Sequence, residues 1–152
     1  MTYAEFLILK DLQDSCQFKQ LLDKYGKYGR YSSRFIVIVD DEGNCHLFDK
    51  NRNETSIDKV KSIGIWTFDC CTSLTTISIP NSVKFIGDWA FYNCTSLTSI
   101  KIPNSVKSIG DNAFHNCRSL KKVIFKGKTL EEVQAMENYP WKLKISQFST
   151  QK

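Results

Sequence analysis

The sequence contains no long run of apolar residues. The longest one near the start, Phe6–Leu9, is bounded by Glu5 and Lys10. Such a run is too short for the apolar part of a signal peptide, and a membrane-spanning helix needs about 20 residues. We therefore expect a soluble, cytoplasmic protein without membrane insertion. A virion or a cell surface is the alternative location.

Histidine is scarce, with two in 152 residues, and no G-x-S-x-G, Walker A or paired-carboxylate motif is present. Cys45-His46, His115 and Cys117 are the residues with metal-ligand chemistry. They lack the C-x-x-C or H-x-x-x-H spacing of a zinc site. We expect no catalytic residues, no cofactor and no metal.

What the sequence does have is a repeat of 23 residues. It reads LTTISIPNSVKFIGDWAFYNCTS from Leu74 and LTSIKIPNSVKSIGDNAFHNCRS from Leu97, and it begins again at Leu120 as LKKVIF. A weaker copy lies upstream, between Val60 and Cys71. Repeats of about 20 to 29 residues with a regular leucine are typical of solenoids, in which each copy needs neighbours to bury its apolar side.

One copy indicates how a turn of the solenoid folds. Leu97–Ile102 alternates as a short strand, Pro103-Asn104 ends it, Gly110-Asp111 makes a second turn, and Ala113–Cys117 is expected to be a short helical segment. The positions expected to point inward are Leu97, Ile100, Ile102, Val106, Ile109, Ala113, Phe114 and Cys117.

Three of the six cysteines, Cys71, Cys94 and Cys117, are one period apart. In a solenoid they stack at the same inward position, where a small free thiol packs well. Equivalent side chains run parallel, which is poor geometry for disulfides. We therefore expect reduced cysteines in a reducing compartment. Cys16, Cys45 and Cys70 follow no pattern.

The repeat resembles that of the BspA-like leucine-rich-repeat family, L-x-x-I-x-I-P-x-S-V-x-x-I-G-x-x-A-F-x-x-C-x-x. Leu74–Ser96 and Leu97–Ser119 match at every signature position and Ile57–Ser73 matches in part, so the resemblance covers roughly residues 57–140. It implies a leucine-rich-repeat solenoid that is a non-catalytic binding scaffold. The family is known mostly from surface proteins of bacteria and protists that serve in adhesion and host binding, and related repeats occur in viral and phage proteins.

The two ends of the chain do not repeat. Capping boxes at Thr2–Glu5 and Asp14–Gln17 predict two helices, and Arg34–Val39 and Cys45–Phe48 predict a hairpin. Tyr25–Tyr31 is expected to be a loop, and the expected linker spans residues 49–54. We expect this block to cover the first turn of the solenoid or to form a small domain with its own binding role.

At the other end, Thr129–Glu132 is a third capping box, and we expect a helix to about Asn138 that covers the last turn through Leu130, Val133 and Met136. Residues 141–145 alternate as a final strand. The expected fold is α/β: an N-terminal cap over residues 1–56, a solenoid of about three rungs over residues 57–128 and a C-terminal helical cap over residues 129–152.

The excess positive charge lies in the repeats, where residues 58–128 carry 10 basic and 4 acidic side chains. Lys61, Lys84 and Lys107 are one period apart and are expected to stack about 5 Å apart. With Lys101, Lys121 and Lys122 they predict a basic surface for an acidic protein or for nucleic acid. The simpler interpretation is that these lysines keep the repeats soluble.

A second candidate surface is the outward face of the longer strands. It consists of Thr76, Ser78, Ser99, Lys101, Lys122 and Ile124. Small polar residues suit a flat protein contact, and they equally suit an unused face.

Tyr25, Tyr28 and Tyr31 alternate with Lys27 and Arg30, a composition that can stack on bases and hold phosphates. Tyrosines packed on a cap are the commoner case. We expect a non-catalytic protein–protein interaction module, such as a phage- or bacterium-encoded inhibitor or adaptor that binds a host protein. The alternatives are a surface or virion adhesion component and a nucleic-acid-associated protein with a basic repeat face.

Overall fold

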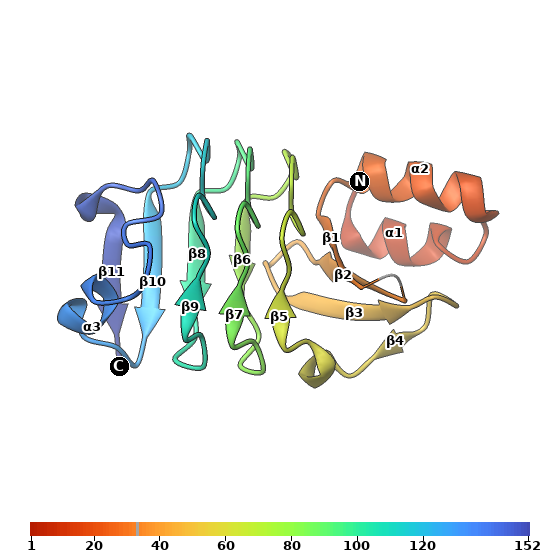
Figure 1. The fold of residues 1–152 in the computed structure, drawn as a ribbon. Helices are drawn as coiled ribbons and strands as arrows, with labels where there is room; N and C mark the ends of the chain where they lie inside the picture. Colours follow the sequence, from red (N-terminus) through yellow and green to blue (C-terminus); the bar gives the residue numbers. More distant parts are fainter. Residues whose placement is uncertain (33) are drawn as a thin grey trace.

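The computed structural model describes residues 1–32 and 34–152. It is a row of stacked parallel strands, with helices α1 and α2 and an antiparallel sheet at its N-terminal end and helix α3 near its C-terminal end (Figure 1). No helix in the described residues is long and apolar enough to cross a membrane. All six cysteines are free thiols.

The N-terminal block is two helices packed on an antiparallel sheet. Helices α1 (Tyr3–Leu9) and α2 (Ser15–Tyr25) begin at the predicted capping boxes, with Thr2 and Asp14 as N-caps. The sheet has the order β1-β2-β3-β4 and includes the predicted hairpin. Its strands are β1 (Tyr28–Ser32), β2 (Phe35–Val39), β3 (Cys45–Asp49) and β4 (Glu54–Thr55).

Two predictions for this block were wrong. The expected loop at residues 25–31 is largely strand β1, in which Gly29 pairs with Val37 of β2. The expected linker, residues 49–54, is a connection within the sheet: it joins β3 to β4, and its last residue, Glu54, pairs with Phe48 of β3. Gly29 is compatible with a strand because it packs against the solenoid, where a Cβ atom would lie 2.7 Å from the ring of Phe68. The glycine reflects that close approach and not a break in the chain.

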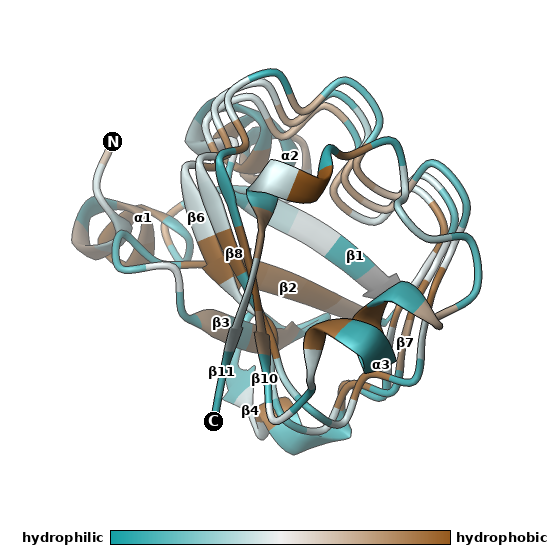
Figure 2. Ribbon diagram, turned by 90° about the vertical axis from the view of Figure 1, so that its left-hand side faces the viewer, coloured by the Kyte–Doolittle hydropathy of each residue, from teal (hydrophilic) through white to brown (hydrophobic). Residues whose placement is uncertain are grey.

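The repeats form two parallel sheets, one with the order β11-β10-β8-β6 and one with the order β5-β7-β9. Thr76 pairs with Ser99, and Ser99 pairs with Lys122, so neighbouring strands are one repeat apart. The strands are β5 (Ser62–Ile63), β6 (Thr76–Ser78), β7 (Phe85–Ile86), β8 (Ser99–Ile102), β9 (Ser108–Ile109), β10 (Lys122–Lys126) and β11 (Phe148–Gln151). Seen from the C-terminal end, the turns superimpose (Figure 2).

All eight positions predicted to point inward are buried. However, the segment that carries Ala113 and Phe114 is a turn and not the predicted helix. Its carbonyl oxygens bond to the preceding rung: the Phe91 amide donates to the Ala113 carbonyl oxygen at 2.8 Å, and the Asn93 amide to that of His115 at 3.0 Å. A helix would use these groups within the segment, so stacking of the rungs favours the turn.

The C-terminal end also differs from its prediction. Helix α3 (Leu130–Gln134) begins at the Thr129 capping box but ends earlier than expected. Val133 is buried and Met136 packs on the core, whereas Leu130 is 44% exposed. The final strand is β11, and not residues 141–145. Trp141 is buried in a turn and donates from Nε1 to the carbonyl oxygen of Ile109 at 3.1 Å.

The N-terminal block joins the core of the solenoid. Val37, Val39 and Leu47 of the hairpin belong to the same buried cluster as the repeat residues. The block also continues the hydrogen-bond ladder, because the Ser78 amide donates to the Gly43 carbonyl oxygen at 2.8 Å. The otherwise open edge of β6 is therefore paired at this point. A second, smaller cluster lies between the helices and the sheet; it consists of Phe6, Leu21, Leu22, Tyr25, Ile38 and Phe48.

Candidate binding surfaces

The lysine column consists of Lys61, Lys84 and Lys107, which lie in register just before β5, β7 and β9. The Lys84 amide donates to the Lys61 carbonyl oxygen at 2.9 Å, and the Lys107 amide to that of Lys84 at 2.7 Å. All three residues are exposed. Like charges on neighbouring rungs repel, so an anionic surface placed here relieves that repulsion.

The other predicted contact residues lie on the second sheet. They are Thr76 and Ser78 on β6, Ser99 and Lys101 on β8, and Lys122 on β10. The basic surface expected from combining them with the lysine column is therefore divided between two walls of the solenoid. Lys121, next to Lys122, also lies on this side, away from the column.

The face of this second sheet is only partly free. Thr76 packs against Gly43 of the N-terminal block, and its Oγ1 lies 3.1 Å from Oγ of Ser99 in a hydrogen bond. Ile124 was expected to point outward, yet it is only 9% exposed. Lys101 and Lys122 remain exposed. The exposed part of this face is therefore two lysines beside half-buried hydroxyl groups, and its role in binding stays a prediction.

A column of aromatic rings lies on the turns that follow β5, β7 and β9. Trp66 and Trp89 stack with centroids 5.2 Å apart and planes 11° apart, and Tyr92 and His115 stack at 5.6 Å and 12°. Tyr92 also meets Trp89 edge-on at 5.3 Å. Sequence reasoning missed this column. The available signal was two tryptophans one period apart, at a position that the family repeat leaves free.

These tryptophans have an unusual backbone. Trp66 and Trp89 have φ of 62° and 58°, in the left-handed region, and Asn112 has 56° at the same position of the third turn. Asparagine tolerates this conformation, whereas it is rare for bulky residues. Both tryptophans therefore hold a strained backbone on the protein surface.

A second position of the repeat also has a left-handed backbone, and Cys70, which followed no pattern in the sequence, lies at this position in the first turn. Cys70, Asn93 and Asn116 have φ of 55°, 62° and 62°. Asn116 donates from Nδ2 to Oδ1 of Asn93, and Asn93 donates to the Cys70 sulfur at 3.6 Å. Cys70 therefore occupies the first place in an asparagine ladder.

A groove of about 620 Å³ separates the first turn of the solenoid from the N-terminal block. Its lining residues include Asp23, Tyr28, Arg30, Ile65, Trp66 and Asp69. Tyr28 donates from its hydroxyl group to Oδ1 of Asp23 at 2.6 Å. The groove thus has both aromatic and charged walls.

Of the tyrosines considered for nucleic acid, Tyr25 is not free to stack on a base. Tyr25 is buried, and its hydroxyl group donates to the Val39 carbonyl oxygen at 2.6 Å. Lys27 forms an ion pair with Asp41 at 3.1 Å. The side chain of Tyr31 lies outside the described residues. This part of the nucleic-acid hypothesis therefore has no support from the geometry.

The metal-ligand candidates are far from forming one site. Cys45 and His46 lie on β3, whereas His115 and Cys117 lie in and after the turn that follows β9. Within residues 1–32 and 34–152, no group of three or more His, Cys, Asp or Glu side chains could hold a metal ion. Cys45 instead donates to the Ser78 carbonyl oxygen at 3.4 Å.

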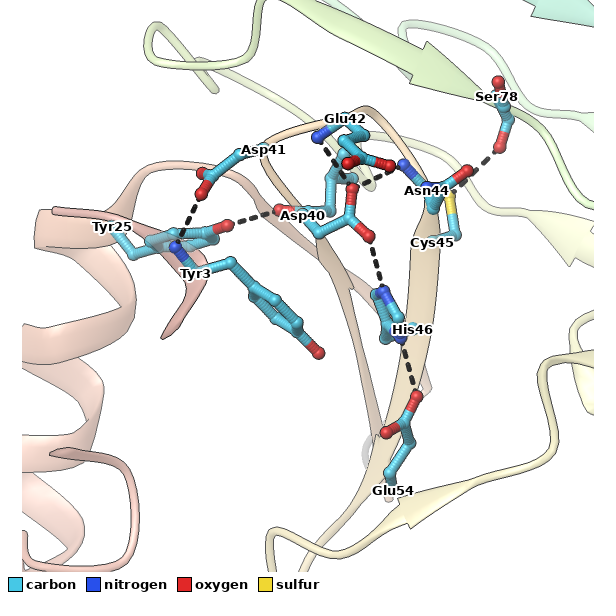
Figure 3. Close-up of polar contacts among 11 residues, drawn as sticks. Tyr3, Tyr25, Asp40, Asp41, Glu42, Asn44, Cys45, His46, Glu54 and Ser78 are labelled. Atoms are coloured by element: carbon cyan, nitrogen blue, oxygen red, sulfur yellow. Dashed lines mark hydrogen bonds and ion pairs between the residues drawn. The ribbon is translucent and has the colours of Figure 1, made fainter. Parts of the chain in front are cut away.

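His46 lies between two carboxylates (Figure 3). Its Nε2 is 2.8 Å from Oδ2 of Asp40 and its Nδ1 is 2.6 Å from Oε1 of Glu54. Burial by itself lowers the pKa of His46, but the hydrogen bonds to Asp40 and Glu54 outweigh it and raise this pKa above its usual value. Tyr3 stacks on the imidazole at 4.9 Å, and its amide donates to Oδ2 of Asp41 at 3.0 Å. The cluster fastens α1 to the hairpin.

The repeats match a family of known proteins. A family model for the BspA type leucine-rich-repeat region, with six copies, matches residues 44–148. A solved leucine-rich-repeat protein from Bacteroides ovatus is 30% identical, with a TM-score of 0.45, over 60% of this chain and 28% of its own. A leucine-rich cell surface protein from Faecalibacterium prausnitzii is 24% identical, with a TM-score of 0.41, over 64% of this chain and 32% of its own.

This chain thus spans about a third or less of the length of those two proteins. No curated protein matches it. The residues that the family model matches extend beyond the repeats described above: they include strand β3 at one end and reach the first residue of β11 at the other. Because that model covers more than half of the sequence, the protein belongs to the BspA-type leucine-rich-repeat family.

Proposed function

We propose that the protein is a non-catalytic module that binds an acidic surface of a partner protein through the lysine column and Phe85. Its repeat family consists of interaction and surface modules, which supports binding as the function in general terms. The specific surface is an inference from the side chains of the sheet β5-β7-β9.

The observation that carries the proposal is the position of Phe85. It lies on β7 between Ser62 of β5 and Ser108 of β9, in the same register row, and it is 50% exposed. The exposed Lys84 precedes it directly. Aromatic anchors dominate the binding energy of many interfaces, and flanking charges steer the encounter with a partner of opposite sign. Phe85 beside the three lysines of the column combines such an aromatic anchor with flanking charges of one sign.

On this proposal the protein acts as an inhibitor or adaptor on a host protein, encoded by a phage or a bacterium and located in the cytoplasm. Adhesion from a virion or a cell surface is the alternative role for the same surface. Cell fractionation followed by detection of the protein separates the two roles, because an adhesion component is recovered with virions or envelopes.

The proposal is tested by affinity capture from nuclease-treated host lysate with three forms of the full chain: wild type, K61E/K84E/K107E and F85S. The matched control is K19E/K24E/K50E, which makes the same charge change at exposed lysines of the N-terminal block. We expect a wild-type partner to be retained by the control and lost from the other two variants. Charges in solvent are screened over about 8 Å at physiological ionic strength, so capture should also weaken as salt rises.

A partner that both variants retain would show that another surface binds. Loss of all capture after nuclease treatment, together with a salt-sensitive shift of labelled DNA, would instead favour the nucleic-acid alternative.

A further inference from the structure

The aromatic column has one open end. Trp66 is its first ring, and Trp89 of the next turn covers one face of the Trp66 indole at 5.2 Å. Trp89 belongs to the second turn, and successive turns advance away from the N-terminal block (Figure 1). The groove of about 620 Å³ lies on this side, and Trp66 is one of its lining residues. Because Trp66 is 47% exposed and stacks on Trp89 through one face, we infer that its other face is available to a ligand in the groove.

The turn does not need a tryptophan at this position. The Trp66 amide donates to the Asp88 carbonyl oxygen at 3.3 Å and the Trp89 amide to that of Asp111 at 3.2 Å, whereas the third turn adopts the same conformation with Asn112. Trp66 combines a left-handed backbone with a side chain that is 47% exposed. The fold requires the left-handed backbone at this position but does not require a tryptophan there. A bulky residue held in a strained conformation is typical of functional positions.

The groove also contains charged hydrogen-bonding groups. Among the described residues, none forms a hydrogen bond or ion pair with the Arg30 guanidinium. Oδ1 of Asp23 accepts the Tyr28 hydroxyl at 2.6 Å, which leaves Oδ2 available. Asp69, beside Trp66, accepts a hydrogen bond from the Cys70 thiol at 3.2 Å through Oδ1 only. The groove therefore offers two carboxylate oxygens and a planar donor around an aromatic face.

We propose that this groove is a carbohydrate-binding site in which a pyranose ring stacks on the free face of Trp66 and its hydroxyl groups bond to Asp23, Arg30 and Asp69. A pyranose has C–H groups on its faces, which carry partial positive charge and suit the negative face of an indole. Its rim carries hydroxyl groups that both donate to carboxylates and accept from a guanidinium. The volume is within the range of about 300 to 1,000 Å³ that is usual for small-molecule sites.

Other ligand classes fit less well. A nucleic acid would bring phosphates close to Asp23 and Asp69, where the charges repel. An apolar peptide side chain would remove water from three charged groups without pairing them, which is costly. A sugar satisfies the aromatic face and the charged groups together. This site is separate from the lysine column and Phe85, so it adds a second ligand to the protein.

The test is a glycan array probed with the full chain, followed by isothermal titration calorimetry with the methyl glycosides and short oligosaccharides of the best hits, a readout that does not depend on Trp66 itself. W66N is the main variant because Asn112 holds the same backbone in the third turn. F85S is the matched control, since it removes an exposed aromatic ring at a position where the sister strands have serine. We expect affinity to fall at least tenfold in W66N, which corresponds to about 1.4 kcal/mol, and to be unchanged in F85S.

D69N and R30Q remove the charges of two groups in the groove while keeping side chains of similar polarity. Each should weaken glycan binding severalfold, and these two variants supply the test if W66N unfolds. Wild-type protein that binds no glycan on the array and shows no heat of binding with the methyl glycosides of glucose, galactose, mannose and N-acetylglucosamine overturns the proposal. Binding that W66N, D69N and R30Q all retain overturns it as well. Loss of glycan binding in W66N with protein capture intact separates this site from the proposed protein-binding surface.

Discussion

The thiol of Cys71 donates to the carbonyl oxygen of Tyr28 at 2.9 Å, across the boundary between the repeats and the N-terminal block. Cys94 makes the same bond to Phe68 at 3.0 Å, and Cys117 makes it to Phe91 at 3.1 Å. In those two cases the acceptor belongs to the preceding turn of the solenoid. Strand β1 therefore takes the place of a preceding turn for the first repeat, and the cysteine column serves as a ladder of weak hydrogen bonds.

Thiol labelling tests this ladder. Burial is the main cause that raises the pKa of Cys45, Cys71 and Cys117 to about 12, and it also raises that of Cys94. Because the thiolate is the reactive form, we expect iodoacetamide at pH 8 to label only the exposed Cys16 and Cys70 in native protein. Mass spectrometry of the peptides gives the sites, and labelling in denaturant serves as the control for reactivity. Native labelling of Cys94 would contradict the ladder.

Gly29→Ala tests the contact between β1 and the first repeat. The added Cβ would lie 2.7 Å from the Phe68 ring, which is buried and stacked on Phe91. Overpacking of this kind lowers the free energy of unfolding by about 1 to 3 kcal/mol, measurable by urea denaturation. Gly64→Ala is the control, because its Cβ meets only Thr67 Oγ1 at 3.3 Å. Its effect should stay within about 0.5 kcal/mol, and equal effects of the two variants would argue against the contact.

The His46 cluster predicts a pH dependence of stability. The pKa of His46 in the folded chain lies above its usual 6.5, because the hydrogen bonds to Asp40 and Glu54 outweigh burial. A raised folded-state pKa stabilises fully below the unfolded pKa, and this contribution is lost as pH rises through the folded pKa. We expect the free energy of unfolding to fall as the pH rises above the usual histidine pKa of about 6.5.

His46→Gln is the control for this pH dependence. Glutamine has no titrating group, so urea denaturation of this variant should show a flatter profile across the same pH range. An unchanged profile would mean that another group causes the slope. Asp40 acts at the other end of the scale: burial by itself raises its pKa, but hydrogen bonds from His46, Asn44 and Glu42 outweigh it and lower it. Its contribution is therefore lost only as pH falls below the usual range for a carboxyl group.

The asparagine ladder predicts a difference between two substitutions at Asn116, which has φ of 62° and bonds to Asn93. Both Asn116→Ala and Asn116→Gly remove the side-chain bond, but alanine also strains a left-handed backbone by about 1 to 2 kcal/mol. We expect Asn116→Gly to be the more stable variant by about 1 kcal/mol in thermal and urea denaturation. Equal stabilities would indicate that the backbone changes conformation when the ladder is lost.

The division of the chain at residues 56 and 128 stays a prediction. The N-terminal block shares its core with the repeats through Val37, Val39 and Leu47. We expect the separate solenoid to expose these contacts and the unpaired edge of β6, and therefore to aggregate.

The sequence by itself determined the register of the solenoid. Two nearly identical copies place equivalent side chains one repeat apart, so burial of Leu97, Ile100 and Ile102 and the stacking of the lysines follow from the period of 23 residues. The sequence also determined where the three helices begin, at the capping boxes of Thr2, Asp14 and Thr129, because the hydrogen bonds that start a helix are local.

Only the tertiary structure decided the features that depend on contacts between distant segments. Gly29 lies in a strand because Val37 pairs with it and Phe68 packs on it. The segment of Ala113 is a turn because its carbonyl oxygen bonds to the rung before it. The groove exists because docking of the N-terminal block brings Arg30 opposite Trp66. The repeat period determines how the copies stack on one another. What packs against the first copy depends on the non-repeating N-terminal block, whose contacts do not follow from the period.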